Sequence, residues 1–175
     1  MSLEGKRVAI LAEDNYEILE LWYPLLYLRG EGAKVQVVGP AAPPHTYLSK
    51  HDYPANVDVA ADKVSATDFD AVVVPGGFAP DRLRRYPAVL KLVKDAFDQG
   101  KVVAAICHGP WVLISAKVLS GKNVTSVSAV KDDVINAGAA WFDREMVRDG
   151  NLITSRTPDD LPAFCKAIAA ALSGG

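Results

Sequence analysis

The chain has 175 residues, a formal net charge of −2 and a sequence pI of about 5.9. Its 50% hydrophobic and 23% charged residues suffice for a packed core, which excludes extended disorder. The absence of a basic excess argues against nucleic acid or an anionic membrane as a partner, and two cysteines are too few for a disulfide framework.

The N-terminal residues lead directly into a predicted strand, without the apolar stretch of a signal peptide. No run approaches the roughly 18 apolar residues of a transmembrane helix. The length suits one domain better than two. We therefore expect a single domain over residues 1–175, located in the cytoplasm, with no membrane or nucleic-acid partner.

The first half of the chain alternates strand and helix patterns. In chain order, these patterns predict a strand at 7–12, a helix at 16–29 that Gly30 closes, a strand at 34–38, extended structure near 45–60 and a strand at 70–74. Pro24 lies inside the helical pattern. Because proline removes a backbone donor, we expect a kink or a break near Tyr23.

The second half continues the alternation. It predicts a helix at 87–99, a strand at 101–106, a helix at 110–119, a hairpin turn at Asp149-Gly150 and a last helix that Thr157 caps. Cys165 lies on the apolar face of that last helix, which indicates a core position. The strand runs are continuously apolar, as in strands covered on both faces. The pattern predicts a three-layer α/β sandwich with a mainly parallel sheet.

The most informative segment is the predicted strand-to-helix turn at Cys107. The strand ends at Ile106 and a helix begins by Pro110, so His108 and Gly109 form almost the whole loop. Unpaired N–H groups at a helix start favour negative charge, so a thiol here is expected to ionise more easily than free cysteine. The alternative is a small buried cysteine, which the position at a strand end makes the weaker interpretation.

A second strand ends in Pro75-Gly76-Gly77. Glycines at this position leave backbone N–H groups free to point into a pocket. The N–H of Gly77, together with that of His108, could form an oxyanion hole for an attacked carbonyl. Taken alone, the two glycines are equally consistent with an ordinary turn after a strand.

Residues 105–110, Ala-Ile-Cys-His-Gly-Pro, resemble the nucleophile segment of the ThiJ/PfpI superfamily, and most closely its PfpI branch of intracellular proteases and stress-linked deglycases. Further matching pieces occur in the family's order along nearly the whole chain, at 16–21, 69–77, 79–81, 131–133, 136–138 and 154–158. The chain departs from the pattern at Phe78, Trp111 and Val127, which suggests a more apolar pocket mouth and leaves substrate choice open.

The resemblance implies a flavodoxin-like sandwich and a role for each matching residue. Cys107 would be the nucleophile, Glu17 the protonated carboxyl that shares a proton with the sulfur, and His108 the adjacent acid–base residue. Asp81 would orient the histidine of a neighbouring subunit, so the resemblance implies a homodimer or larger homo-oligomer. Without the family, Glu17 is only an acidic residue in a first helical turn, and Asp81 is only a helix cap.

Three functions stay open. The resemblance favours a cysteine-dependent stress enzyme acting on small reactive aldehydes or early glycation adducts, of the glyoxalase or deglycase type. An intracellular cysteine peptidase ranks second, because adjacent Cys107 and His108 rarely aim at each other from one turn. A redox sensor or chaperone is a third function, since a thiolate at a helix start oxidises readily. It ranks last because no part of the chain resembles an exposed client-binding segment.

The histidine count excludes other chemistries. The only histidines are His45, His51 and His108, so none follows the turn to complete a glutamine-amidotransferase or papain-like triad. They also form no plausible zinc cluster. The Gly76-Gly77 pair lacks the glycine spacing of a dinucleotide site. We therefore expect no metal and no cofactor.

Overall fold

The computed structural model describes residues 2–175. Within them, one sheet has seven strands in the order β10-β11-β7-β6-β1-β2-β5, parallel except for the β10–β11 hairpin. Its strands are β1 (Arg7–Leu11), β2 (Lys34–Gly39), β5 (Val59–Ala60), β6 (Ala71–Val74), β7 (Val102–Ile106), β10 (Met146–Asp149) and β11 (Leu152–Ser155). Two small ribbons pair β3 (Thr46–Leu48) with β4 (Pro54–Asn56), and β8 (Asn123–Val124) with β9 (Ala140–Trp141).

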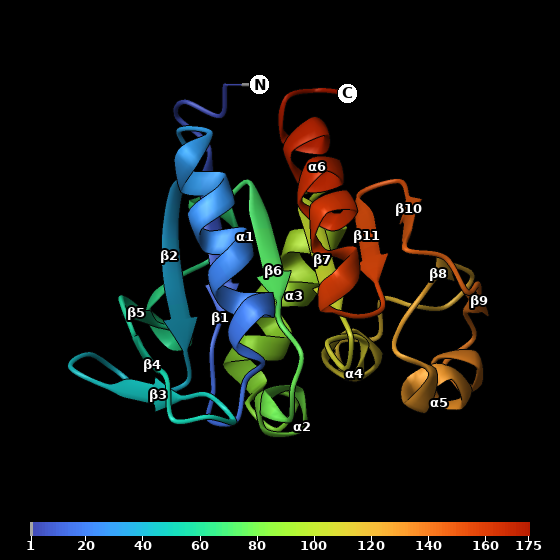
Figure 1. The fold of residues 1–175 in the computed structure, drawn as a ribbon, viewed down its shortest axis with the longest axis horizontal. Helices are drawn as coiled ribbons and strands as arrows, with labels where there is room; N and C mark the ends of the chain where they lie inside the picture. The colour runs from blue at the N-terminus through green and yellow to red at the C-terminus, as the bar shows by residue number, and fades with distance from the viewer. Residues whose placement is uncertain (1) are drawn as a thin grey trace.

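Helices cover both faces of the sheet. The helices are α1 (Ile18–Gly30), α2 (Ala79–Leu83), α3 (Pro87–Asp98), α4 (Pro110–Ser115), α5 (Lys131–Asn136) and α6 (Leu161–Leu172). In Figure 1, α1 and α6 lie side by side in front of the sheet, and α3 packs behind it against β6 and β7. This is the predicted three-layer sandwich with a mainly parallel sheet.

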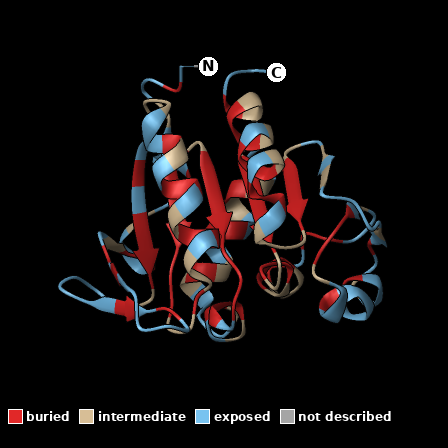
Figure 2. Ribbon diagram, viewed as in Figure 1, coloured by how far each residue is buried: buried red, intermediate tan, exposed pale blue. Residues whose placement is uncertain are grey.

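The core follows from the continuous apolar runs of the central strands. Every residue of β6 and β7 is buried, and Figure 2 shows these strands as buried along their length. Helix α3 turns an apolar stripe toward them that includes Val89, Leu92 and Val93. A parallel strand covered on both faces needs this pattern, which explains why the strands were readable in the sequence.

The parallel strands end at one edge of the sheet. In Figure 1 their arrowheads point toward α2, α4 and the β3–β4 ribbon, while both chain termini lie at the opposite end. Strand β6 leads there into Gly76 and Gly77, and the neighbouring strand β7 leads into Cys107. The carboxyl edge of a parallel sheet is where α/β proteins place their sites.

Several predictions about helices need correction. Helix α1 continues through Pro24 without a break, because buried Leu21, Leu25 and Leu28 anchor both of its halves to the core. The proline leaves only the carbonyl of Glu20 without its helical N–H donor. Helix α4 ends at Ser115 rather than 119, and Thr157 makes no capping hydrogen bond with its side chain.

The hairpin and the extended region agree with the sequence. Strands β10 and β11 pair around Gly150, whose φ is 64°. Strands β3, β4 and β5 lie within the predicted extended region near residues 45–60. No helix within residues 2–175 combines the length and apolar character that a membrane crossing requires.

Candidate active site

Cys107 occupies a constrained turn between β7 and α4. Its φ is 63°, in the left-handed region that non-glycine residues seldom adopt. Two backbone hydrogen bonds hold it there: the Cys107 N–H donates to the Ser155 carbonyl at 3.1 Å, and the Val127 N–H donates to the Cys107 carbonyl at 3.2 Å. A side chain at Gly109 would lie 2.6 Å from the Val74 carbonyl oxygen, so the turn requires glycine at that position.

The two glycines after β6 form the facing wall of the site. A side chain at Gly76 would collide with the Glu20 carboxyl and lie 2.7 Å from Cys107 Cβ. Gly77 has a φ of 75°. Its N–H and that of His108 both hydrogen-bond to the Cys107 sulfur, and each bond acts to lower the pKa of the thiol. These are the two backbone donors that the sequence predicts for an oxyanion hole.

The carboxyl group beside Cys107 belongs to Glu20. Its side chain is fully buried, and its Oε2 accepts a hydrogen bond of 2.8 Å from the Gly76 N–H. Its other oxygen, Oε1, has no hydrogen-bond partner of ordinary geometry within residues 2–175. The Cys107 thiol is the neighbouring ionisable group that interacts with this carboxyl.

The contact predicted for Glu17 is therefore made by Glu20, three residues further along α1. Glu17 is the residue preceding the helix, and its carboxylate forms an ion pair with Lys50. Glu20, one helical turn after Glu17, points inward to the ends of the strands, whereas Glu17 lies nearer the mouth of the site. Its partner Lys50 follows β3 and is held by a 3.1 Å hydrogen bond from its N–H to the Tyr16 carbonyl.

His108 contacts the Cys107 sulfur directly. Its Nδ1 lies 3.3 Å from Cys107 Sγ, although adjacent residues seldom aim at each other. Burial, followed by the charge of Lys50, holds the pKa of His108 below its ordinary value. The imidazole is therefore neutral at neutral pH and able to accept a proton.

Two aromatic side chains flank the His108 ring. Phe78 lies 6.2 Å from it, centroid to centroid, and is 60% exposed, while Trp111 lies 5.0 Å from it. Val127 packs against the core beside the turn. These are the three positions at which the sequence departs from its family pattern; Phe78 and Trp111 lie beside His108, whereas Val127 lines a separate hollow with Trp141 and Arg156.

Burial dominates the titration of the reactive pair. It raises the pKa of Glu20 to about 7, and burial together with the Glu20 charge raises the pKa of Cys107 to about 12. The expected lowering of the thiol pKa is wrong, because these two effects outweigh the N–H groups of Gly77 and His108. Above pH 7 the pair therefore keeps one proton, which these pKa values place on the sulfur.

Asp81 lies in α2 and forms an ion pair with Arg85, which follows the end of that helix at Leu83. Its side chain is 49% exposed, and the residue capping α2 is Phe78, so the capping role is also wrong. The structure thus leaves Asp81 on the surface of its own chain. Cys165, in contrast, is fully buried on α6, where its apolar pattern places it.

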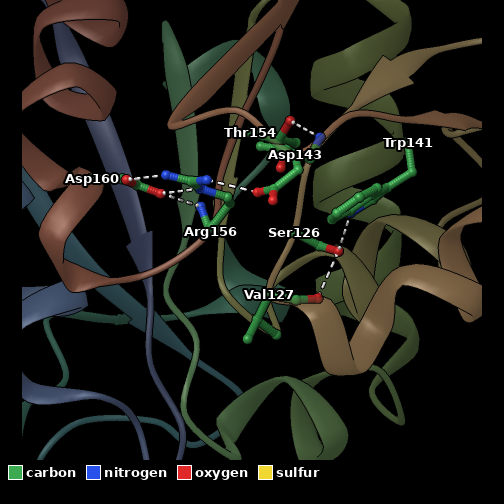
Figure 3. A network of polar contacts seen from close by, with 8 residues as sticks. Ser126, Val127, Trp141, Asp143, Thr154, Arg156 and Asp160 are labelled. Atoms are coloured by element: carbon green, nitrogen blue, oxygen red, sulfur yellow. Dashed lines mark hydrogen bonds and ion pairs between the residues drawn. The ribbon is translucent and has the colours of Figure 1, made fainter.

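Polar contacts brace the segments next to Ser155 and Val127, the two residues that bond to the Cys107 backbone (Figure 3). Arg156 forms ion pairs with Asp160 at 2.9 Å and with Asp143 at 2.6 Å. On the other side, the Trp141 indole N–H donates to Ser126 Oγ at 3.0 Å, and that hydroxyl donates to the Val127 carbonyl at 3.0 Å. The network fixes the segments that supply the two backbone bonds to Cys107.

The signal for Glu20 is its burial in the structure, which the family resemblance does not use. Glu20 is buried together with residues 21, 24, 25 and 28, and it is the buried acidic residue of α1. A carboxyl group on a buried face is rarely unpaired and marks a functional position. Lys50 has no such signal, because only the tertiary fold brings β3 to this edge. No group of three or more histidine, cysteine or acidic side chains among residues 2–175 is placed to hold a metal ion.

Comparisons with known proteins agree with this geometry. The sequence profile of the DJ-1/PfpI family matches residues 6–171. The chain is 42% identical over 160 residues to Deglycase PfpI of Pyrococcus furiosus, covering 91% of this chain and 95% of the relative. It is 41% identical over 161 residues to Protein/nucleic acid deglycase 2 of Escherichia coli, covering 91% and 94%.

A solved structure extends the likeness to the fold. The crystal structure of Drosophila melanogaster DJ-1beta matches with a TM-score of 0.90 and 32% identity, covering 100% of this chain and 92% of that chain. The flavodoxin-like sandwich that the sequence resemblance implies is thereby confirmed. The chain belongs to the DJ-1/PfpI family.

Proposed function

We propose that this protein is a cysteine-dependent enzyme that converts small dicarbonyls, and their early adducts on amines or thiols, into hydroxy acids. The observation that carries the proposal is the buried Glu20 carboxyl beside a partly exposed Cys107 thiol, with two backbone N–H groups directed at the sulfur. A single thiol with one proton acceptor and an oxyanion site suits addition to a small aldehyde.

The first step is addition. Glu20 takes the thiol proton, and the Cys107 sulfur forms a bond to the aldehyde carbon. The aldehyde oxygen gains the electron pair near the N–H groups of Gly77 and His108, and it recovers the proton from Glu20. An adduct on an amine enters the same path when the sulfur displaces the amine, which leaves with a proton.

The second step moves hydrogen within the substrate. Neutral His108 removes the hydrogen of the former aldehyde carbon as a proton and returns it to the neighbouring carbonyl carbon, while the hydroxyl proton on the first carbon passes to the oxygen of the second. One carbon is thereby oxidised and its neighbour reduced, so no external oxidant is needed. The product is a thioester of a 2-hydroxy acid, which water cleaves to release the acid and the Cys107 thiol.

We further propose that the active unit is a homo-oligomer in which Asp81 of one copy approaches His108 of another. The support is that Asp81 is half-exposed on α2, while His108 contacts Cys107 and pairs with no acidic side chain within residues 2–175. A carboxylate facing the imidazole would fix its orientation and favour its protonated form during the second step.

A cysteine peptidase is the second candidate, favoured by one specific observation. The 3.3 Å contact between Cys107 Sγ and His108 Nδ1 is the nucleophile–base geometry that amide hydrolysis requires. Amide cleavage makes the sulfur attack a peptide carbonyl and His108 protonate the leaving amine. The two reactions share the nucleophile but differ in substrate.

A substrate survey separates them. Wild type and Cys107→Ser are compared on methylglyoxal, on its adducts with an amino acid and a thiol, and on unfolded peptides. We expect hydroxy-acid release from the first two classes by wild type alone. Cleavage of peptides without hydroxy-acid production would replace the proposed function by the peptidase. Equal activity of the serine variant would remove Cys107 from both reactions.

A further inference from the structure

A cleft lies beside the Cys107 site but does not include the thiol. Its volume is about 560 Å³, and helices α2, α4 and α5 surround it. Small-molecule sites typically occupy about 300 to 1,000 Å³. A three-carbon dicarbonyl needs far less room, so the cleft is large enough for a second, non-reacting part of a substrate.

Trp111 joins the cleft to the reactive centre. Its ring packs 5.0 Å from that of His108, and the same side chain lines the cleft. A hydrogen bond of 2.9 Å from its indole N–H to Asp133 Oδ2 fixes its orientation. A molecule bound at Cys107 therefore needs to extend only past one aromatic side chain to reach the cleft.

Two cations line the cleft without an ion-pair partner within residues 2–175. The Arg84 guanidinium lies 5.8 Å from the Trp111 ring and is oriented by a 2.9 Å hydrogen bond from its Nε to Ser115 Oγ. Lys117 occupies a left-handed position with a φ of 61°, where glycine is the usual choice after a helix. The one carboxylate of the lining, on Asp133, already accepts the Trp111 N–H.

From these contacts we infer that the cleft is a subsite for the anionic, non-reacting part of the substrate. The substrate class is an early dicarbonyl adduct on an amine or thiol compound that carries a carboxylate or phosphate. The dicarbonyl end reacts at Cys107, Trp111 packs along the middle, and Arg84 and Lys117 bind the anion. This inference rests on the proposed function and specifies its substrate class.

The kinetic test compares two adducts that differ in one charge. Methylglyoxal is combined with N-acetylcysteine, which is anionic, or with N-acetylcysteine amide, which is neutral. For Arg84→Met/Lys117→Met we expect KM for the anionic adduct to rise about tenfold, as for loss of a charged hydrogen bond, with kcat nearly unchanged. Values for the neutral adduct and for free methylglyoxal should not change.

Lys94→Met is the matched control, because it removes an exposed cation on α3, where Lys94 pairs with Asp98. It should leave all KM values unchanged. An equal rise of KM for both adducts in the double variant would overturn the inference. A change of oligomeric state in size-exclusion chromatography, in place of the KM change, would identify the cleft as an interface and also overturn it.

A binding measurement decides the inference even if no dicarbonyl is turned over. N-acetylmethionine carries the anion without a reactive carbonyl, and N-acetylmethionine amide lacks the charge. Tryptophan fluorescence should show tighter binding of the anion to wild type and loss of that preference in the double variant. Equal binding of the two compounds to wild type would refute the subsite, whereas failed turnover with preserved preference would refute only the proposed function.

Discussion

Cys107 and Cys165 have similar ionisation but occupy two very different regions of the molecule. Burial is the first cause of the raised pKa of both thiols, which lie at about 12. Cys165 sits on α6 with its side chain fully buried among apolar residues. Cys107 is partly exposed at the carboxyl edge of the sheet, with Glu20, His108 and two backbone N–H groups around it.

The difference between these regions is the set of partners, not the acidity of the resting thiol. The Cys107 proton has an acceptor beside it, and the resulting thiolate has two donors directed at it. Cys165 has neither, because burial is the sole resolved cause of its pKa shift. A cysteine can thus be reactive with a high resting pKa, provided that a neighbour takes its proton during attack.

The sharpest test of this contrast removes each sulfur in turn. Cys107→Ser should lower turnover at least about 1,000-fold, because the nucleophile is lost, without a comparable loss of stability. Cys165→Ala should keep turnover and lower the free energy of unfolding by about 1 kcal/mol, through a small cavity. Steady-state rates and urea unfolding measure both, and iodoacetamide should label Cys107 first. Preferential labelling of Cys165 would contradict the assignment of Cys107 as the reactive thiol.

The second test separates the two glutamates of α1. Glu20→Gln should lower turnover about 100-fold, because the amide cannot accept the thiol proton. Glu17→Gln removes the partner of Lys50 at the mouth and should have a much smaller effect. The rate of iodoacetamide labelling of Cys107 should rise with pH around 7 in wild type and lose that step in Glu20→Gln. A larger loss in Glu17→Gln would return the role to the residue that the family resemblance implies.

Glu20 also links stability to pH. The unfolded chain releases this proton near pH 4.5, whereas the folded protein holds it to about pH 7. Between these values the folded state binds more protons, so rising pH destabilises it, by on the order of 3 kcal/mol in total. Urea unfolding at pH 5 and pH 8 should show this loss in wild type relative to Glu20→Gln. Parallel pH profiles of the two proteins would contradict the buried titration.

The smallest expected effect concerns Asp81. Asp81→Asn should keep the stability of the exposed α2 surface and lower turnover about tenfold, if the carboxylate of a neighbouring copy orients His108. Mixing this variant with Cys107→Ser should partly restore activity once subunits exchange, because some sites then contain both intact residues. Verified exchange without recovery would place any role of Asp81 within its own chain.

The sequence predicts the fold well because the central strands are continuously apolar and end at strong turn signals, as at Gly76-Gly77 and Gly109. It predicts the position of Cys107 for the same reason. It does not identify Glu20, since two glutamates one helical turn apart match the pattern equally well until the packing direction of α1 is known. The predicted break at Pro24 is wrong because core packing of α1 outweighs the low helix propensity of proline.

The left-handed conformation of Cys107 affects how the protein loses activity on heating. The turn is not a local preference of its residues; the carbonyl of Ser155 and the N–H of Val127 hold it from outside. Loosening either segment releases the turn while the seven-stranded core remains intact. Inactivation on warming should therefore begin as a local, reversible event below the midpoint of global unfolding. Activity is then lost at a lower temperature than the folded core.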